Sequence, residues 1–98
     1  MLKYVSNVEG APAAIGPYSQ AVIADNLMFL SGQIPINPTT GKIDSDDIAI
    51  QAKQVLQNIF AVLSDQGFSF KNVVKATIFL TDLSNFQIVN EIYESFLA

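Results

Sequence analysis

Residues 30–41, with the sequence LSGQIPINPTTG, constrain the fold of this chain more than any other stretch. An apolar run ends at Ser31-Gly32, and a segment with two prolines then leads to Gly41. Proline fixes φ and lacks a backbone donor, whereas glycine accepts left-handed conformations. We therefore expect a strand that opens into the wall of a site, followed by a tight turn at residues 38–41.

Three strands are expected before the first helix. They are residues 2–6, 18–24 and 27–34. Asp25-Asn26 separates the last two, and both residue types tolerate positive φ, which is typical of a two-residue hairpin turn. Residues 7–10 should turn the first strand. Residues 11–17 should form a loop, because prolines and glycines interrupt regular structure.

The first helix is expected to begin at residues 45–47 and to end at Gly67. Ser45 offers a hydroxyl for capping, and Asp46 and Asp47 place acids at the positive end of the helix dipole. Apolar residues recur at spacings of three and four, which puts one broad face on the core. This stripe contains Ile48, Ala52, Val55, Ile59 and Val62, widened by Leu56, Phe60 and Leu63.

The clearest expected strand is residues 73–80, followed by a second helix. One strand face would pack under helices, and the other is partly polar and could meet another subunit. The first face carries Val74, Ala76, Ile78 and Leu80, and the second carries Lys75, Thr77 and Phe79. The second helix should start at residues 81–82 or at Ser84. Its stripe would contain Leu83, Phe86, Val89, Tyr93 and Phe96.

This order of elements predicts an α+β sandwich, with two helices on one face of a mixed β-sheet. Residues 1–98 are expected to form a single domain. The connection through the first helix should be right-handed if the strands it joins are parallel. Four strands cover two helices only thinly, so the pattern favours further strands after the second helix.

Composition narrows the classes of function. The chain is 50% hydrophobic and 14% charged, against roughly 25% charged residues in typical proteins. We therefore expect apolar surface to be buried between subunits. Five lysines, no arginine and a net charge of −4 argue against nucleic-acid binding.

The missing residue types exclude further chemistry. The chain has no cysteine and no histidine, so we expect no disulfide, no thiolate chemistry and no zinc or iron site. No apolar run reaches the roughly 20 residues of a membrane span, and no signal or transit peptide is evident. We expect a cytoplasmic protein, with a mitochondrial location as the alternative in a eukaryote.

Three residues are candidates for a site, each with a structural alternative. Asn90 lies on the apolar stripe of the second helix, where it could either tie the helix to a loop or orient a ligand. Tyr18 follows a rigid Gly-Pro pair and could be a half-buried surface ring or the cover of a ligand. Gly32 could relieve crowding in a strand or let the backbone approach a ligand.

Paired carboxylates offer no convincing acid–base site. Asp46 and Asp47 suit a helix start, and Glu91 and Glu94 suit a solvated helix face. Residue spacing by itself therefore supports an oligomeric α+β domain without a defined activity.

Four ordered motifs resemble the RidA/YjgF/UK114 family of reactive-intermediate deaminases, whose older name is endoribonuclease L-PSP. They are residues 11–21 (APAAIGPYSQA), residues 31–41 (SGQIPINPTTG), residues 73–83 (VVKATIFLTDL) and residues 89–96 (VNEIYESF). The resemblance implies a chorismate-mutase-like fold and a homotrimer with pockets between adjacent subunits. It also implies hydrolysis of 2-iminobutanoate and 2-iminopropanoate to 2-keto acids and ammonia, without a cofactor.

The same resemblance implies a set of substrate-binding residues. They are Tyr18, Ser31, Gly32, Phe86 and Asn90. No residue of the chain is assigned as catalytic.

The resemblance also implies that part of the family's site lies outside this sequence. In the family, two further strands follow the second helix and carry an arginine that clamps the substrate carboxylate, a cysteine and a glutamate. This chain has no arginine or cysteine, so the family's arginine and glutamate are expected to lie beyond Ala98. The chain is therefore expected to be incomplete at its C-terminal end relative to the family, and this form is expected to be weakly active or inactive.

Three hypotheses for function follow. The first is an imine deaminase acting on small 2-imino acids. The second is a trimeric small-molecule-binding, regulatory or chaperone-like module without catalysis, which the missing clamp favours. The third is an endoribonuclease or translation inhibitor, which the older family name implies but which the acidic balance and missing histidine oppose.

Overall fold

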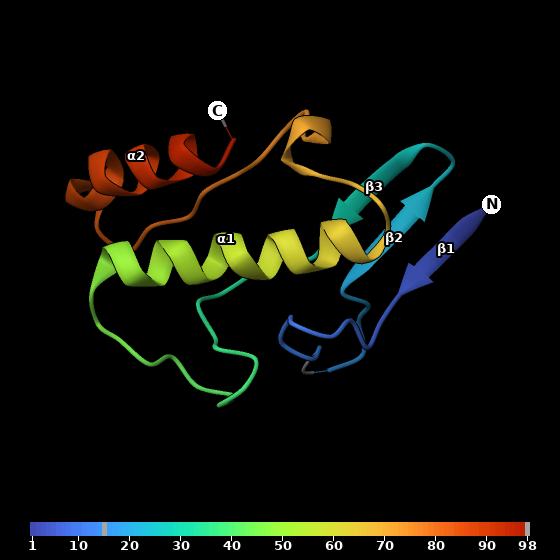
Figure 1. Cartoon of the computed structure of the whole chain (residues 1–98), viewed down its shortest axis with the longest axis horizontal. Helices are drawn as coiled ribbons and strands as arrows, with labels where there is room; N and C mark the ends of the chain where they lie inside the picture. Colours follow the sequence, from blue (N-terminus) through green and yellow to red (C-terminus); the bar gives the residue numbers. More distant parts are fainter. Residues whose placement is uncertain (15, 98) are drawn as a thin grey trace.

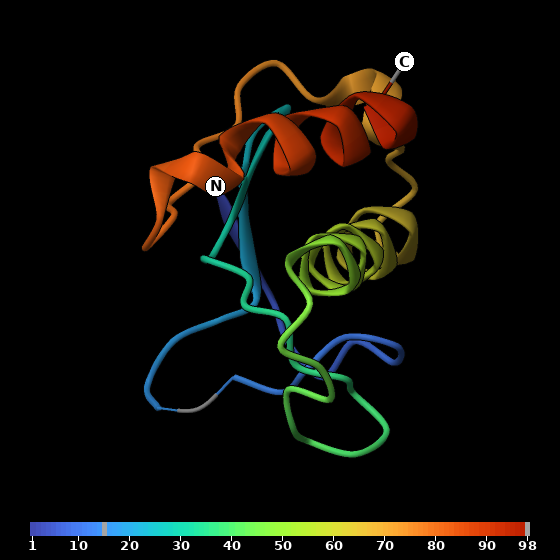
Figure 2. The ribbon, with the colours of Figure 1, turned by 90° about the vertical axis from the view of Figure 1, so that its left-hand side faces the viewer.

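The computed structural model describes residues 1–14 and 16–97. Figure 1 shows a sheet at one end of the molecule, α1 running across its middle, and α2 above α1. In Figure 2, α1 is seen end-on beside the sheet and α2 passes across the top. The α+β class expected from the sequence is therefore confirmed.

The sheet has three antiparallel strands in the order β1-β2-β3. They are β1 (Leu2–Val5), β2 (Ala21–Ala24) and β3 (Leu27–Leu30). Asp25 has a φ of 54°, which confirms the expected hairpin turn. Two expected boundaries are wrong. Strand β2 starts at Ala21 rather than residue 18, and β3 ends at Leu30 rather than near residue 34. The chain turns around Pro17 before β2 and around Pro35 after β3.

Alternation along the strands separates two faces of the sheet. The inner face belongs to a core in which Val5 and Ala21 pack with Val62 of α1, flanked by Met28 and Leu30. The outer face is exposed and apolar. It carries Leu2, Ala24 and Leu27 in one row and Tyr4, Val22 and Phe29 in the next, and nothing in the described part of the chain covers Phe29, which is 60% exposed.

Helix α1 (Ile48–Asp65) lies where the sequence predicts, but Ser45 is not its cap as expected. The Asp47 carboxylate is the N-cap and accepts hydrogen bonds from the backbone of Ala49 and Ile50. At the other end, Gly67 has a φ of +80°. The Phe68 N–H donates to the Leu63 carbonyl at 2.9 Å, which satisfies a carbonyl of the last turn.

The expected strand at residues 73–80 is absent. A strand requires a partner to accept and donate ladder bonds, and no described strand pairs with these residues. The apolar face does not pack under the helices either, because Val74 is 89% exposed and Ile78 is 40% exposed. The described sheet is consequently antiparallel rather than mixed, and the expected crossover to a fourth strand is not formed within it.

The second helix follows a short helical turn. This turn, η2 (Leu83–Asn85), leads into α2 (Phe86–Leu97). Asp82 is the N-cap of this turn, which agrees with the first of the two helix starts expected from the sequence. The Ser84 hydroxyl and the Ser84 N–H both donate to the Asp82 carboxylate. These bonds, the hydroxyl bond more than the N–H bond, hold the pKa of Asp82 below its usual value.

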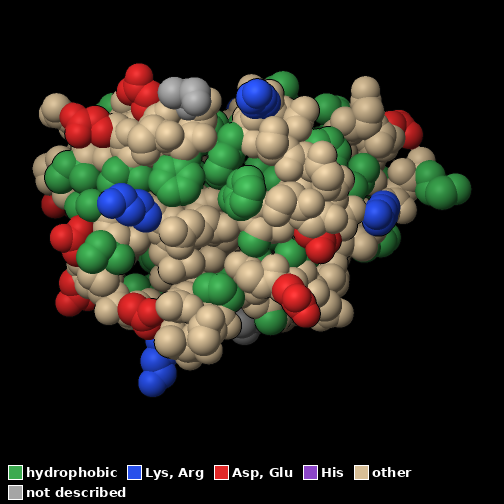
Figure 3. Space-filling model, in the orientation of Figure 1, with side chains coloured by type: hydrophobic (Ala, Val, Ile, Leu, Met, Phe, Trp, Pro, Cys, Tyr) green, Lys and Arg blue, Asp and Glu red, His purple; other side chains and the backbone are tan. Residues whose placement is uncertain are grey.

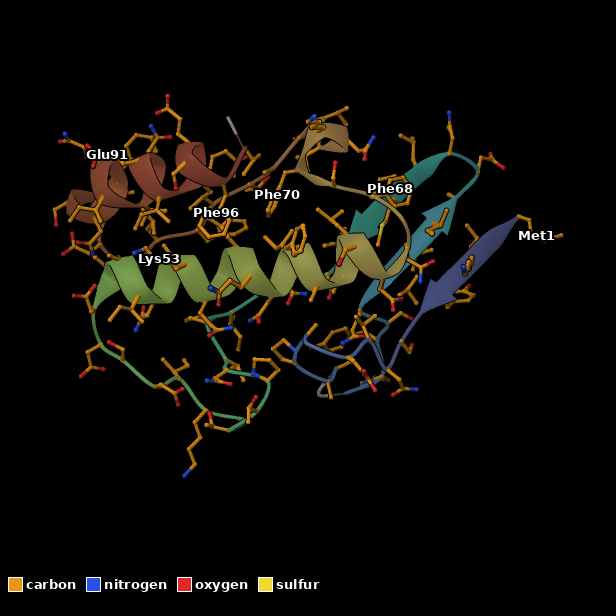
Figure 4. The ribbon with its side chains drawn as sticks, in the orientation of Figure 1. Met1, Lys53, Phe68, Phe70, Glu91 and Phe96 are labelled. Carbon is orange, nitrogen blue, oxygen red and sulfur yellow. The ribbon has the colours of Figure 1, made fainter. Side chains whose placement is uncertain are left out.

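Phenylalanine rings connect α2 to α1. Phe70 belongs to the short helix η1 (Phe70–Asn72). Its ring centroid lies 5.8 Å from that of Phe60 on α1 and 6.0 Å from that of Phe96 on α2. Figure 4 shows Phe70 and Phe96 directed into the space between the two helices. Among the described residues, no helix is long and apolar enough to cross a membrane.

Candidate functional site

A small hollow of about 40 Å³ lies where β3 ends. It is lined by Pro12, Ala13, Ala14, Tyr18, Gln20, Ser31, Gly32, Gln33, Ile34 and Ile36. Two segments therefore form its walls: the loop before β2 and the segment after β3. Three residues expected in the site, Tyr18, Ser31 and Gly32, come together here.

The first wall is shaped by a proline-centred turn and a buried glutamine. The Tyr18 N–H donates to the Gly16 carbonyl at 2.9 Å, which closes a three-residue γ-turn around Pro17. Gln20 is 2% exposed. Its side chain accepts a bond from the Val8 N–H at 2.9 Å and donates to the Pro12 carbonyl at 2.8 Å, so it holds the loop in shape.

Gln20 also joins the first wall to the second. Its backbone carbonyl accepts bonds from both the N–H and the hydroxyl of Ser31, at 3.0 and 3.1 Å. Beside Ser31, a Cβ added to Gly32 would meet no atom of a described residue within 4 Å. Crowding in a strand does not explain this glycine, since the space next to its Cα is open.

A second proline-centred turn continues this wall. The Ile36 N–H donates to the Ile34 carbonyl at 2.8 Å, which forms a γ-turn around Pro35, and the fixed φ of proline suits its central position. Asn58 of α1 donates to the carbonyls of Ile34 and Ile36, at 3.2 and 2.9 Å. Sequence reasoning did not single out Gln20 or Asn58. The sequence did contain a signal for Asn58, because it is a polar residue between Val55 and Val62 on the apolar stripe of α1.

The two candidates on α2 do not line the hollow. Phe86 is 55% exposed and Asn90 is exposed. The expectation that Asn90 points along a buried stripe is therefore wrong within this chain, because Val89 is the residue of α2 that packs inside. Glu91 and Glu94 are exposed, as expected for a solvated helix face.

The expected arginine and glutamate belong to no described part of the site. The resemblance places both beyond Ala98, and Ala98 itself lies outside the described residues, which end at residue 97. Their position therefore stays a prediction. The described residues that line the hollow all come from segments before α1.

The hollow can orient a small polar molecule but is too small to enclose one. Typical ligand pockets measure roughly 300–1,000 Å³, and about 40 Å³ holds little more than one or two water molecules. Of the described residues that line it, none carries a charge. Among the described residues, no group of three or more acidic side chains could hold a metal ion.

A larger and more open cleft, of about 460 Å³, lies between α1 and α2. It is lined by Gln57, Phe60, Phe70, Ser95 and Phe96. Hydrophobic side chains gather along this band of the surface in Figure 3. The polar side chains among these five are one amide and one hydroxyl, so the cleft lacks the convergent polar groups expected of a site for chemistry.

Comparison with known proteins gives one consistent result. The sequence profile of a family described as endoribonuclease L-PSP matches residues 8–98. The chain is 47% identical to a RutC family protein of Pyrococcus horikoshii, covering 99% of the chain and 77% of that protein. It is 44% identical to human 2-iminobutanoate/2-iminopropanoate deaminase, covering 98% of the chain and 70% of that protein.

The structural comparison agrees with the sequence comparison. The crystal structure of the YjgF gene product of E. coli superposes with a TM-score of 0.89 at 46% sequence identity. The match covers 96% of this chain and 73% of that one.

Proposed function

The chain belongs to the endoribonuclease L-PSP family, which includes the RidA/YjgF proteins, and from that membership we propose that it is an imine deaminase. Its substrates would be 2-iminobutanoate and 2-iminopropanoate. Water adds to the imine carbon, the C–N bond of the resulting carbinolamine breaks, and a 2-keto acid and ammonia leave. The observation that carries the proposal is the meeting of Tyr18, Ser31 and Gly32 in a chain 44% identical to a named imine deaminase.

The residues of the hollow suit this reaction. A planar imino acid needs enclosure and oriented hydrogen-bonding groups more than a strong nucleophile. The open space beside Gly32 would admit the flat substrate, and the Tyr18 ring would cover it. The Ser31 hydroxyl oxygen keeps its acceptor capacity while its proton bonds to Gln20, so it could hold an N–H of the substrate.

We also propose that the pocket is completed in a homotrimer. The hollow of one chain is too small for the substrate, and Phe86 and Asn90 are exposed on α2. A neighbouring copy that brought these two residues to the hollow would enlarge and close it. The outer face of the sheet, with Leu27 and Phe29 uncovered, supplies apolar surface for such an assembly.

The test measures keto-acid formation from 2-aminoacrylate generated in place by a serine dehydratase. We expect the purified chain to speed this reaction over its spontaneous rate, but weakly, because the described residues that line the hollow offer no charge to bind the substrate carboxylate. Tyr18→Phe should reduce the rate further. The proposal fails if the protein, completed with the two strands that the family resemblance implies, leaves the spontaneous rate unchanged at every concentration tested.

The neutral lining of the hollow also supports a second candidate, a small-molecule-binding module without catalysis. That candidate predicts saturable binding of 2-oxobutanoate with no turnover of 2-aminoacrylate. Ribonuclease activity has less support, since the chain has a net charge of −4 and no histidine. Incubation with RNA should leave the RNA intact.

A further inference from the structure

Asn58 is a fully buried polar residue in the middle of α1, with 0% of its surface exposed. Its Nδ2 donates to two backbone carbonyls, those of Ile34 and Ile36. Its Oδ1 accepts a bond from Gln54 Nε2 at 2.9 Å. An amide that is buried without partners is costly, and here both ends of the amide are paired.

The two acceptors belong to the same γ-turn. The Ile34 carbonyl also accepts the Ile36 N–H, so the turn is closed by its own bond and then fastened to the helix. A side-chain amide has two N–H donors in one plane, and these meet two carbonyls that the turn places close together. An aliphatic residue at position 58 would fill the core but leave those carbonyls without donors from α1.

The first and last residues of the turn, Ile34 and Ile36, line the hollow. We propose that Asn58 is a positioning residue: by holding Ile34 and Ile36 it sets the distance between the segment after β3 and the loop before β2, the two walls between which the substrate would lie. The inference rests on the proposed imine-acid site. Asn58 does not line the hollow itself, so it acts only through the backbone that it holds.

The same helix offers a matched control. Gln51 donates from Nε2 to the Ser45 carbonyl at 2.8 Å, which is also a side-chain amide fastening a loop to α1. Ser45 does not line the hollow. Asn58→Ala and Gln51→Ala therefore both remove an amide anchor, but only the first anchor holds a wall of the hollow. Gln54→Ala is a milder variant, since it removes only the bond that orients the Asn58 amide.

The experiment combines amide NMR with ligand titration, at a temperature where all variants are folded. In Asn58→Ala we expect faster hydrogen exchange at the Ile36 amide and shifted signals at Ser31 and Gly32. The Kd for 2-oxobutanoate should rise by about tenfold or more, because misplaced site walls cost binding and rate steeply. Gln51→Ala should keep the wild-type Kd within about twofold and leave the hollow's signals in place. Gln54→Ala should change the Kd and the NMR signals in the same direction as Asn58→Ala, but by less.

Failure of the inference and failure of the proposed function give different results. If Asn58→Ala binds 2-oxobutanoate with the wild-type Kd, Asn58 is only a structural anchor and the inference is overturned. If the wild-type chain binds no 2-oxobutanoate, the proposed function loses its support. The exchange and shift data then decide the inference, which is overturned if Ser31, Gly32 and Ile36 are unchanged in Asn58→Ala and Gln54→Ala. If Asn58→Ala does not fold, the Kd, exchange and shift data of Gln54→Ala decide the inference by the same criteria.

Discussion

At the scale of single residues, uncharged amide side chains hold the shape of the hollow by hydrogen bonds to the backbone. Gln20 bonds to two backbone groups of its own loop, and its carbonyl receives both donors of Ser31. Asn58 fastens the opposite wall. Buried amides that are fully bonded keep backbone segments in one geometry, so these residues fix the shape in which any ligand must fit.

Substitution of Gly32 should weaken ligand binding without lowering the stability of the fold. Gly32 has open space beside its Cα and no left-handed φ, so Gly32→Ala should change the free energy of unfolding by less than about 1 kcal/mol, with stabilisation the expected sign. The added methyl group would enter the hollow and weaken binding of 2-oxobutanoate. Urea denaturation and a titration measure the two effects.

Gly41→Ala is the control for this substitution. A Cβ at Gly41 also meets open space, but its φ is +73°, so the variant should lose about 1 kcal/mol or more of stability. Gly32→Ala and Gly41→Ala with equal losses of stability would show that the backbone at Gly32 is also strained, contrary to this expectation.

Sequence pattern cannot tell Asn58 from Asn90. Asn58 lies three residues after Val55 and four before Val62, and Asn90 lies four residues after Phe86 and three before Tyr93. Both therefore read as polar residues on an apolar stripe. Asn58 is buried because the segment after β3 covers that face of α1, whereas Asn90 is exposed. Which stripe is covered depends on tertiary packing, which the spacing does not encode.

At the scale of elements, the helices were predicted well and the last strand was not. A helix satisfies its backbone groups internally, and local signals such as Asp47 and Gly67 mark its ends. A strand depends on partners that are distant in sequence. The alternation in residues 73–80 is real, but no described strand pairs with them. Strands β2 and β3 are shorter than expected, because the chain turns around Pro17 before β2 and around Pro35 after β3.

Phe70 should determine how firmly α2 is attached to α1. Its ring contacts both Phe60 and Phe96, so Phe70→Ala should lower the free energy of unfolding by about 1–3 kcal/mol. The amides of α2 should also exchange faster. Thermal unfolding followed by circular dichroism, with amide exchange, measures both effects.

Phe79→Ala is the matched control, since the side chain of Phe79 is 91% exposed. Its removal should change the free energy of unfolding by less than about 0.5 kcal/mol. An equal effect of both substitutions would mean that residue 79 is packed in solution and that the contacts of Phe70 are not special.

At the scale of the whole molecule, the chain leaves much apolar side-chain area outside a small core. The buried core combines residues such as Val5, Ala21 and Val62, while aromatic rings on the outer sheet face stay exposed. The half-hydrophobic composition predicted surface buried between subunits, and this face is where the proposed trimer would bury it.

Assembly can be tested on the outer sheet face. We expect wild-type protein to sediment with three times the mass of one chain. Phe29→Lys, at a side chain that is 60% exposed, should shift the protein to smaller species, because the buried charge would lack a partner. Ile50→Lys is the control, since Ile50 on α1 is 53% exposed but lies off this face. A wild-type monomer, or equal masses for Phe29→Lys and wild type, would contradict the proposal.

Residues 73–80 have a consequence for how the protein behaves at high concentration. They are rich in β-branched and aromatic residues, and Lys75 is their only charged side chain. Exposed segments of this kind template the stacking of further chains into fibres. Lys75 opposes that stacking by electrostatic repulsion, which salt screens. We therefore expect a concentrated solution of this protein to stay clear for a shorter time as the ionic strength is raised, which light scattering would measure.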